Sequence, residues 1–215
     1  MTDHAADSTI RVAFDADLPH ARWGPLFHVF RLEQPGAGLE WRPARLPARE
    51  RPLLEEADVG LFLEPPQSAG HDALTLDSSP MVVLVAAGDP LAHRDGLSIA
   101  DILDRPFPGC RALHPGWAAF WTLDAYRGGP PAFTRDDVRT AEHALEVIAA
   151  GSAIGTAPSW VASGLTHPGV VALPLRDGPK ARARLVWRSD DENPLVRSLV
   201  ELAGAWSAVG RARPA

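Results

Sequence analysis

The sequence predicts an α/β fold with mostly parallel sheets, organised as two lobes. Apolar strand segments alternate with amphipathic helical segments along the chain, and the connections between them are short. The segment Val59–Leu63 is apolar on both faces, as a strand buried inside a parallel sheet is. With 215 residues, 46% of them hydrophobic, the chain is long enough to bury one large core or two smaller ones.

The N-terminal part predicts a strand followed by a helix. Ile10–Phe14 alternates like a strand, and apolar residues then recur at helical spacing from Trp23 to Phe30. Asp17 is placed to accept the first free amides of this helix as its N-cap, and Gln34-Pro35-Gly36 is placed to end it.

A second strand and helix follow. Leu39–Trp41 predicts a short strand, Pro47–Glu56 a helix, and Val59–Leu63 the buried strand. Glu64–Gly70 interrupts regular structure, and a short strand at Leu74–Leu76 precedes the strongest strand candidate, Val82–Ala87.

The second half carries clear helix boundaries. Ser98 and Asp101 have the spacing of a capping box. Thr140 and Gly151 bound a helix at the N-cap and C-terminal glycine positions. Further helices are predicted after Pro115-Gly116 and at Asn193–Val209, and further strands at Ala153–Thr156, Val170–Leu175 and Leu185–Trp187.

Composition narrows the function classes. The balance of 21 basic and 27 acidic residues gives a net charge of −6, the wrong sign for contacting nucleic-acid phosphates. Cys110 is the single cysteine, so the chain forms no internal disulfide, which suits a reducing cytosol. The first nine residues lack the basic start and apolar run of a secretion signal, and no apolar run reaches membrane-spanning length. We therefore expect a cytoplasmic protein without membrane contact.

Four blocks of the sequence together resemble the effector-binding domain of LysR-type transcriptional regulators. They are Ala57–Leu63 with Asp58 entering its strand, Pro80–Ile102 with its Gly88-Asp89-Pro90 turn, Ala144–Trp160, and Arg184–Arg188 with the helix after it. The resemblance covers about residues 9–207. It implies a type 2 periplasmic-binding-protein fold: two Rossmann-like lobes with mixed, mostly parallel sheets, joined by crossover strands near Ser78 and Lys180.

The resemblance also implies the domain boundaries. Lobe I is expected at residues 9–78 and 184–210, lobe II at 79–183, and flexible tails at 1–8 and 211–215. The family's N-terminal helix-turn-helix and linker helix do not precede Ile10 here. Either a shortened chain or a stand-alone sensor accounts for this.

Ligands of open parallel sheets bind beyond the carboxyl ends of the strands. In this sequence those points are 15–20, 44–47, 110–117 and 138–140, with 156–159 beside the last. The resemblance implies that they line a cleft between the lobes and hold a small organic anion. The expected ligand contacts are Asp17, Leu18, His20, Arg45, Phe62, Cys110, Arg111, His114, Thr140, Thr156 and Pro158.

Each expected contact has a structural alternative. Thr140 is the leading contact because a helix N-terminus favours a carboxylate, but a cap alone also explains it. Thr156 and Ser159 either touch the effector or satisfy a turn. Arg45 and Arg111 either bind the ligand carboxylate through bidentate hydrogen bonds or lie solvated on the surface.

The sequence gives less support to amine binding, to a catalytic pair and to a metal site. Asp17 would repel an anion, so it either caps its helix or meets an amino group. Cys110 and His114 lack the third orienting group and oxyanion site of a catalytic pair. The eight His residues show no metal-ligand spacing on one helix, and we expect no metal or cofactor. Trp23, Trp117 and Trp121 are expected mostly in the core.

The resulting expectation is a non-catalytic effector sensor of a LysR-type regulator. The resemblance implies a homodimer through the helix around Trp23–Phe30 and the strand near Lys180–Trp187, with DNA bound only by a separate helix-turn-helix. A solute-binding protein for transport, or a small enzyme on the same scaffold, are the alternatives. The first would need export and the second a set of acids, bases or nucleophiles converging in the cleft.

Overall fold

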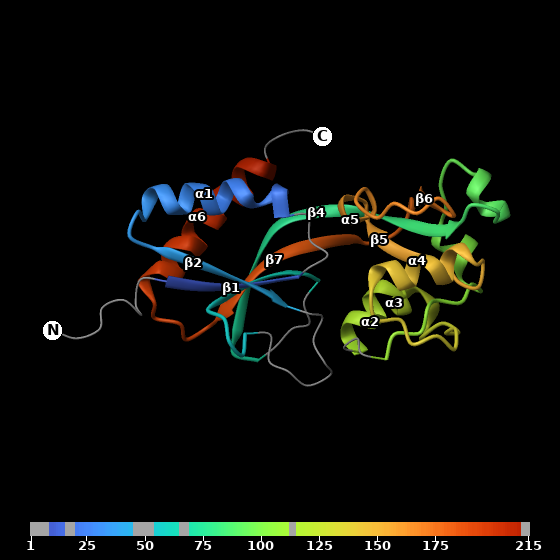
Figure 1. Cartoon of the computed structure of the whole chain (residues 1–215), viewed down its shortest axis with the longest axis horizontal. Coiled ribbons are helices and arrows are strands. Elements are labelled where there is room, and N and C mark those ends of the chain that lie inside the picture. The colour runs from blue at the N-terminus through green and yellow to red at the C-terminus, as the bar shows by residue number, and fades with distance from the viewer. Residues whose placement is uncertain (1–8, 16–19, 45–53, 65–68, 112–114, 212–215) are drawn as a thin grey trace. The chain divides into compact units, whose positions relative to one another are not determined.

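The computed structural model describes residues 9–15, 20–44, 54–64, 69–111 and 115–211, and the chain divides into two compact units (Figure 1). The first unit holds the described residues up to Ser78 and those from Arg182 onward. The second unit holds Ser79–Ala181.

The sheet of the first unit is of mixed sense. Strand β1 (Thr9–Asp15) runs parallel to β2 (Gly38–Ala44) on one side and to β3 (Val59–Leu63) on the other. The other edge of β3 pairs antiparallel with β7 (Lys180–Arg188). All five residues of β3 are buried, as predicted, because strands flank it on both edges and apolar side chains cover both faces.

Two helices of the first unit pack against each other. Helix α1 (Gly24–Glu33) contacts α6 (Pro194–Arg211), and Gln34 Nε2 donates to Ser198 Oγ at 3.1 Å. The face of α1 that carries Leu26, Phe27 and Phe30 is buried. Both helices were predicted from their apolar spacing, and both predictions are confirmed.

The start of α1 differs from the sequence prediction. A short 3-10 helix, η2 (His20–Arg22), comes first, and α1 begins only at Gly24 with Trp23 at the N-cap position and no side-chain cap. Pro25 in the first turn explains this start, since proline needs no hydrogen-bond partner there. The assignment of Asp17 as the cap of this helix was therefore wrong, and Asp17 itself lies outside the described residues.

One long strand replaces two predicted short ones. Strand β4 (His71–Ala86) runs without a break through Leu74–Leu76 and Val82–Ala86. Pro80 does not end it, because an exposed proline costs a strand only one backbone donor. In the sheet order β4 lies beside β7.

In the second unit β4 is the central strand. It pairs antiparallel with β5 (Gly155–Pro158) on one edge and with β6 (Val170–Pro174) on the other. Strand β5 begins two residues later than predicted, because the amide of Ile154 donates to the carbonyl oxygen of Pro106 (2.9 Å) outside the β4–β5 ladder.

Helices pack around these strands. They are η3 (Pro90–His93), η4 (Ile99–Ile102), α2 (Pro115–Trp121), α3 (Asp124–Arg127), α4 (Ala141–Ala149) and α5 (Ser159–Ala162). The capping box of Ser98 and Asp101 is present, with a 3-10 helix behind it. The four-residue helices α3 and α5 were not predicted, since each is too short for a periodic signal. The predicted helix at 47–56 lies mostly outside the described residues, and its described end, 54–56, is a turn followed by bends.

One core cluster lies in the second unit. Met81, Val83 and Val85 from β4 pack with apolar residues of the helices and loops around them, including Ile102 and Leu123. Trp23 and Trp117 are buried at 2% and 1% exposure, which confirms the core prediction for both. No helix in the described ranges is long and apolar enough to cross a membrane.

Candidate functional site

Two extended segments of the second unit run parallel and carry predicted ligand contacts at their ends. Phe107 forms a parallel bridge with Phe133, and the amide of Val138 donates to the carbonyl oxygen of Gly109 at 2.7 Å. Cys110 and Arg111 follow the first segment, and Thr140 follows the second. Because the carboxyl ends of parallel segments meet at one edge, the structure brings these three predicted contacts to the same place.

Thr140 sits at the start of α4 as predicted. Its backbone is extended (φ −137°, ψ 158°), and its Oγ1 accepts a hydrogen bond from the amide of His143 at 3.2 Å. Leu145, Val147 and Ile148 hold the helix against the core, so its N-terminus is firmly placed. The first-turn amides of a helix have no partner within the helix, which makes this end attractive to an anion.

Two carboxylates at the same place were missed by sequence reasoning. Asp137 accepts hydrogen bonds from Arg139 (Nη2 at 2.9 Å, Nε at 3.2 Å) and from the backbone amide of Arg111 at 3.4 Å. The Arg139 hydrogen bonds, before any other cause, hold the pKa of Asp137 below its ordinary value. For Glu142 the pKa is lowered first by its own backbone amide and then by the Thr140 hydroxyl.

These charges change the expected electrostatics of the site. Asp137 and Glu142 offset Arg111 and Arg139, so these four side chains add no net positive charge. Recognition of an anion here would rest on the N-terminal end of α4 rather than on an excess of arginine, because the Thr140 hydroxyl already bonds Glu142 and the amide of His143. Both acidic residues stand within three positions of Thr140 in the sequence, but only the structure shows that Asp137 contacts Arg139 and the amide of Arg111.

Thr156 and Pro158 lie on β5. The hydroxyl of Thr156 donates to the carbonyl oxygen of Trp121, the last residue of α2, and its oxygen keeps lone pairs that can still accept. Pro158 is buried opposite Met81 of β4. Beside it, Ser159 shares a hydrogen bond of 2.8 Å with the buried hydroxyl of Ser79.

The cysteine at this end is a free, half-buried thiol. His114, its proposed neighbour in a catalytic pair, lies outside the described residues. Nothing in the described geometry places a base or an oxyanion site beside Cys110.

In the first unit the predicted contacts follow β1, β2 and β3. Asp17, Leu18 and Arg45 lie outside the described residues, as does the side chain of His20. Phe62 of β3 is buried at 2% exposure. Its ring lies against Gly60, where an added Cβ would fall 2.0 Å from the ring carbon Cε2. The glycine thus makes room for the ring.

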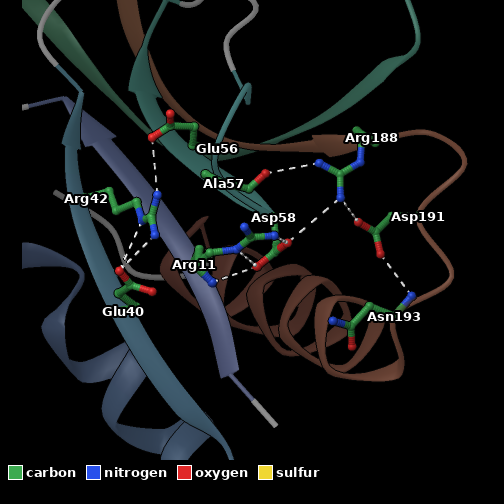
Figure 2. Close-up of polar contacts among 9 residues, drawn as sticks. All are labelled: Arg11, Glu40, Arg42, Glu56, Ala57, Asp58, Arg188, Asp191 and Asn193. Carbon is green, nitrogen blue, oxygen red and sulfur yellow. Dashed lines mark hydrogen bonds and ion pairs between the residues drawn. The ribbon is translucent and has the colours of Figure 1, made fainter. Parts of the chain in front are cut away.

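A polar network lies at the opposite, amino-terminal end of β3 (Figure 2). Asp58 is 7% exposed, and its Oδ2 accepts the backbone amide of Arg11 (2.7 Å) and its Nε (3.2 Å), while Oδ1 accepts Nη2 at 2.8 Å. Arg188 Nη2 lies 3.9 Å from Oδ1 and donates to Asp191 at 2.9 Å. Burial alone would raise the pKa of Asp58, but hydrogen bonds from Arg11 and the charge of Arg188 hold it below its ordinary value.

This network explains the acidic residue that precedes the buried strand. Asp58 joins β1 to the start of β3, and Arg188 joins it to the end of β7. Its role is structural, since it aligns these three strands.

Comparison with known proteins identifies the family. The family model described as the LysR substrate binding domain matches residues 4–208. No curated protein sequence matched the chain.

Solved structures of similar fold include LysR-type regulators and their effector-binding domains. The BenM effector-binding domain with its effector benzoate has a TM-score of 0.72 and 21% identity, covering 96% of this chain and 95% of that one. Full-length CbnR complexed with target DNA has a TM-score of 0.68 and 18% identity, covering 93% and 70%. The C-terminal domain of a probable LysR family regulator from Rhodococcus sp. RHA1 has a TM-score of 0.67 and 19% identity, covering 91% and 98%.

These structural likenesses agree with the mixed α/β fold that the sequence predicts. The family model spans nearly the whole chain, and it rests on sequence rather than on fold alone. The protein therefore belongs to the family of LysR substrate-binding domains.

Proposed function

We propose that this chain is the effector sensor of a LysR-type transcriptional regulator and that its effector is a small organic carboxylate held at the Thr140 end of the second unit. The observation that carries the proposal is the meeting of Cys110, Arg111 and Thr140 at the start of α4. Family membership and the benzoate named for BenM support the class of ligand.

The N-terminal end of α4 beside Thr140 would attract the carboxylate, and the guanidinium of Arg111 would form an ion pair with it. Asp137 already receives the guanidinium of Arg139, so its charge is largely compensated. Thr156 and Pro158 would contact the remainder of the effector from β5. The ligand contacts predicted at Asp17, Leu18, His20, Arg45, Phe62 and His114 belong to the same proposal.

A cap-preserving substitution tests this site. Thr140→Asp keeps a good N-cap residue but places a negative charge where the ligand carboxylate would lie. Benzoate titrated by calorimetry should bind wild type and Thr140→Ser, and should bind Thr140→Asp at least about tenfold more weakly, which corresponds to about 1.4 kcal/mol. Benzamide, which has no charge, should bind much more weakly than benzoate to wild type.

Two controls separate a site effect from a folding effect. Thr166→Val changes an exposed threonine of the same unit and should leave binding unchanged. The melting temperature of Thr140→Asp should equal or exceed that of wild type, because aspartate favours a helix N-terminus. Equal benzoate affinity for wild type and Thr140→Asp would remove Thr140 from the site.

The same proposal makes the domain a non-catalytic sensor that acts in the cytoplasm. A ligand shifts the regulator only through its different affinity for the two conformational states. The domain itself would not touch DNA, in keeping with its net charge of −6. Incubation with benzoate followed by mass spectrometry should return the ligand unchanged. A product of altered mass would favour the enzyme alternative.

We also propose a homodimer that uses the exposed side of α1 and the side chains of β7. The apolar residues Leu26, Phe27 and Phe30 are buried within the unit, whereas Leu32 is 67% exposed. Strand β7 lies between β3 and β4 in the sheet order, so its side chains rather than a free backbone edge would face a partner. Leu32→Arg should shift sedimentation toward the monomer, and Leu103→Arg, at an exposed position of the second unit, should not.

A further inference from the structure

The first unit contains an apolar hollow of about 270 Å³ that is separate from the Thr140 end of the second unit. It lies between the N-terminal half of α1 and the strands β1, β2 and β3. Its described lining is Phe14, Trp23, Gly24, Phe27, Trp41 and Leu61. The hollow opens to solvent, and it is concave and mostly apolar, as small-molecule sites in proteins commonly are.

The walls of the hollow are aromatic and rigidly placed. The ring of Trp41 stands edge-on to Phe27 (centroids 4.6 Å apart, interplanar angle 73°) and to Phe14 (5.9 Å, 68°). Trp23, Phe27 and Leu61 are buried at 3% exposure or less, whereas Trp41 is 43% exposed. Trp41 therefore forms the solvent-facing wall. Trp23, Phe27 and Leu61 form the buried walls, while Phe14 is half-buried and Gly24 is exposed.

The lining also defines the chemistry of a ligand. Every described lining residue is aromatic, aliphatic or glycine, and none carries a charge. A carboxylate would lose its hydration here without an ionic partner, which is costly. A neutral ring gains from burial and from edge-to-face contacts with the surrounding rings.

Size narrows the ligand further. An engineered apolar cavity of about 150 Å³ in another protein binds benzene, and drug-sized ligands occupy sites of about 300 Å³ or more. A hollow of about 270 Å³ suits a molecule of one or two rings.

We propose that the hollow beneath α1, walled by Phe14, Trp23, Phe27, Trp41 and Leu61, is a second ligand site that binds a neutral aromatic molecule of one or two rings. This inference goes beyond the proposed carboxylate site, because none of the described lining residues is among the contacts proposed for the carboxylate and the uncharged lining suits a different class of ligand. Either site can fail without the other.

Fluorobenzene followed by ¹⁹F NMR is a direct probe of this site. Its resonance should shift or broaden saturably on addition of the protein. Trp41→Ala removes the solvent-facing wall and should weaken binding at least about fivefold, whereas Trp41→Phe keeps a ring there and should retain most of it. Tyr126→Ala removes a similarly exposed aromatic residue from the second unit and should have no effect.

A variant that fills the hollow with a larger side chain tests the site even if Trp41→Ala folds poorly. A Cβ added at Gly24 meets no atom within 4 Å, so Gly24→Leu has room for its side chain and replaces glycine in a helix. This variant should raise the melting temperature and abolish fluorobenzene binding. Thr140→Asp should bind fluorobenzene like wild type, and excess benzoate should not displace it.

Several outcomes would overturn the proposal. One is that fluorobenzene shows no saturable binding, and another is that wild type and Gly24→Leu bind it equally well. A third is that benzoate displaces fluorobenzene and Thr140→Asp also loses fluorobenzene binding. A change in oligomeric state caused by Trp41→Ala, measured by sedimentation without any change in fluorobenzene affinity, would instead assign Trp41 to contact with a second copy of the chain.

Discussion

Glu64 and Arg182 are joined by hydrogen bonds through both their backbones and their side chains. The amide of Glu64 donates to the carbonyl oxygen of Arg182 at 2.9 Å, and Glu64 Oε1 accepts the amide of Arg182 at 2.7 Å. The guanidinium of Arg182 donates two further hydrogen bonds to the Glu64 carboxylate, from Nε to Oε1 at 2.8 Å and from Nη2 to Oε2 at 3.0 Å. The carboxylate thus closes the end of β3 onto β7, and Glu64 adopts a φ of 40° to reach this position.

The two ends of this contact should respond unequally to mutation. Glu64→Ala leaves the amide of Arg182 without its acceptor and should cost about 2 kcal/mol of unfolding free energy. Arg182→Ala should cost less, about 1 kcal/mol, because that guanidinium is half-exposed and the backbone bonds survive. Urea denaturation of both variants measures the difference, and equal losses would show that the side-chain pair rather than the amide dominates.

The Asp58 network should make stability depend on acid pH. The pKa of Asp58 is lower in the folded state than in the unfolded chain, so the unfolded state binds more protons as pH falls. Its contribution is therefore full above the unfolded pKa of about 3.9 and is lost as pH falls through the folded value. Asp58→Asn should lose about 1–2 kcal/mol at pH 7 and show a flatter stability profile below pH 4.

The control for this prediction is an exposed acid in the same unit. Asp72→Asn should keep both the stability of wild type at pH 7 and its acid-dependent loss. If Asp58→Asn and wild type lose stability in parallel between pH 5 and 2, other carboxylates account for the dependence.

Gly109 should tolerate no side chain. A Cβ at this position would lie 2.5 Å from the carbonyl oxygen of Asp136 and 2.8 Å from that of Thr134, and both atoms belong to backbone. Gly109→Ala must push the two parallel segments apart and should cost about 1–3 kcal/mol. It should also weaken benzoate binding, because Arg111 and Thr140 follow these segments.

Gly88→Ala is the matched control, since a Cβ there meets nothing within 4 Å. Thermal unfolding should place this variant within about 0.5 kcal/mol of wild type. A stable Gly109→Ala variant with unchanged benzoate affinity would contradict the close packing of the two segments.

Arg127 should not be replaceable by lysine. Its guanidinium donates to the carbonyl oxygens of Ile102 (2.9 Å), Leu103 and Thr122 (2.8 Å), and it lies 4.9 Å from the centroid of Phe107. Burial, opposed only in part by nearby aspartates, lowers its pKa from the ordinary arginine value. An ammonium group cannot reproduce this planar fork.

Arg127→Lys and Arg127→Met should each cost about 1–2 kcal/mol, because each leaves carbonyl groups without their donors. Arg135→Lys, at an exposed position in the same unit, should cost less than about 0.5 kcal/mol. Chemical denaturation checks all three variants, and full stability of Arg127→Lys would show that a single charge suffices.

Local sequence signals predicted most of the elements and one residue of the candidate site. Thr140 and Gly151 bound α4 as expected, and Ser98 and Asp101 form the expected capping box, because caps depend on neighbours within three or four residues. Strand β3 was recognisable because both of its faces are apolar. The blocks around Asp58 and Gly88-Asp89-Pro90 were sufficient to indicate the family.

Long-range contacts decided the rest. Helix α1 begins at Gly24 rather than near Asp17, and β4 continues through Pro80, because partners distant in the sequence determine where a helix or strand ends. Asp137 reaches the amide of Arg111 across 26 residues, and Glu64 reaches Arg182 across 118. The sequence by itself determined which segments are helices and strands and which helix end is capped by Thr140, since those depend on local hydrogen bonds and periodicity. Only the tertiary structure decided which charges surround that helix end and where the aromatic hollow lies, because both depend on residues that folding alone brings together.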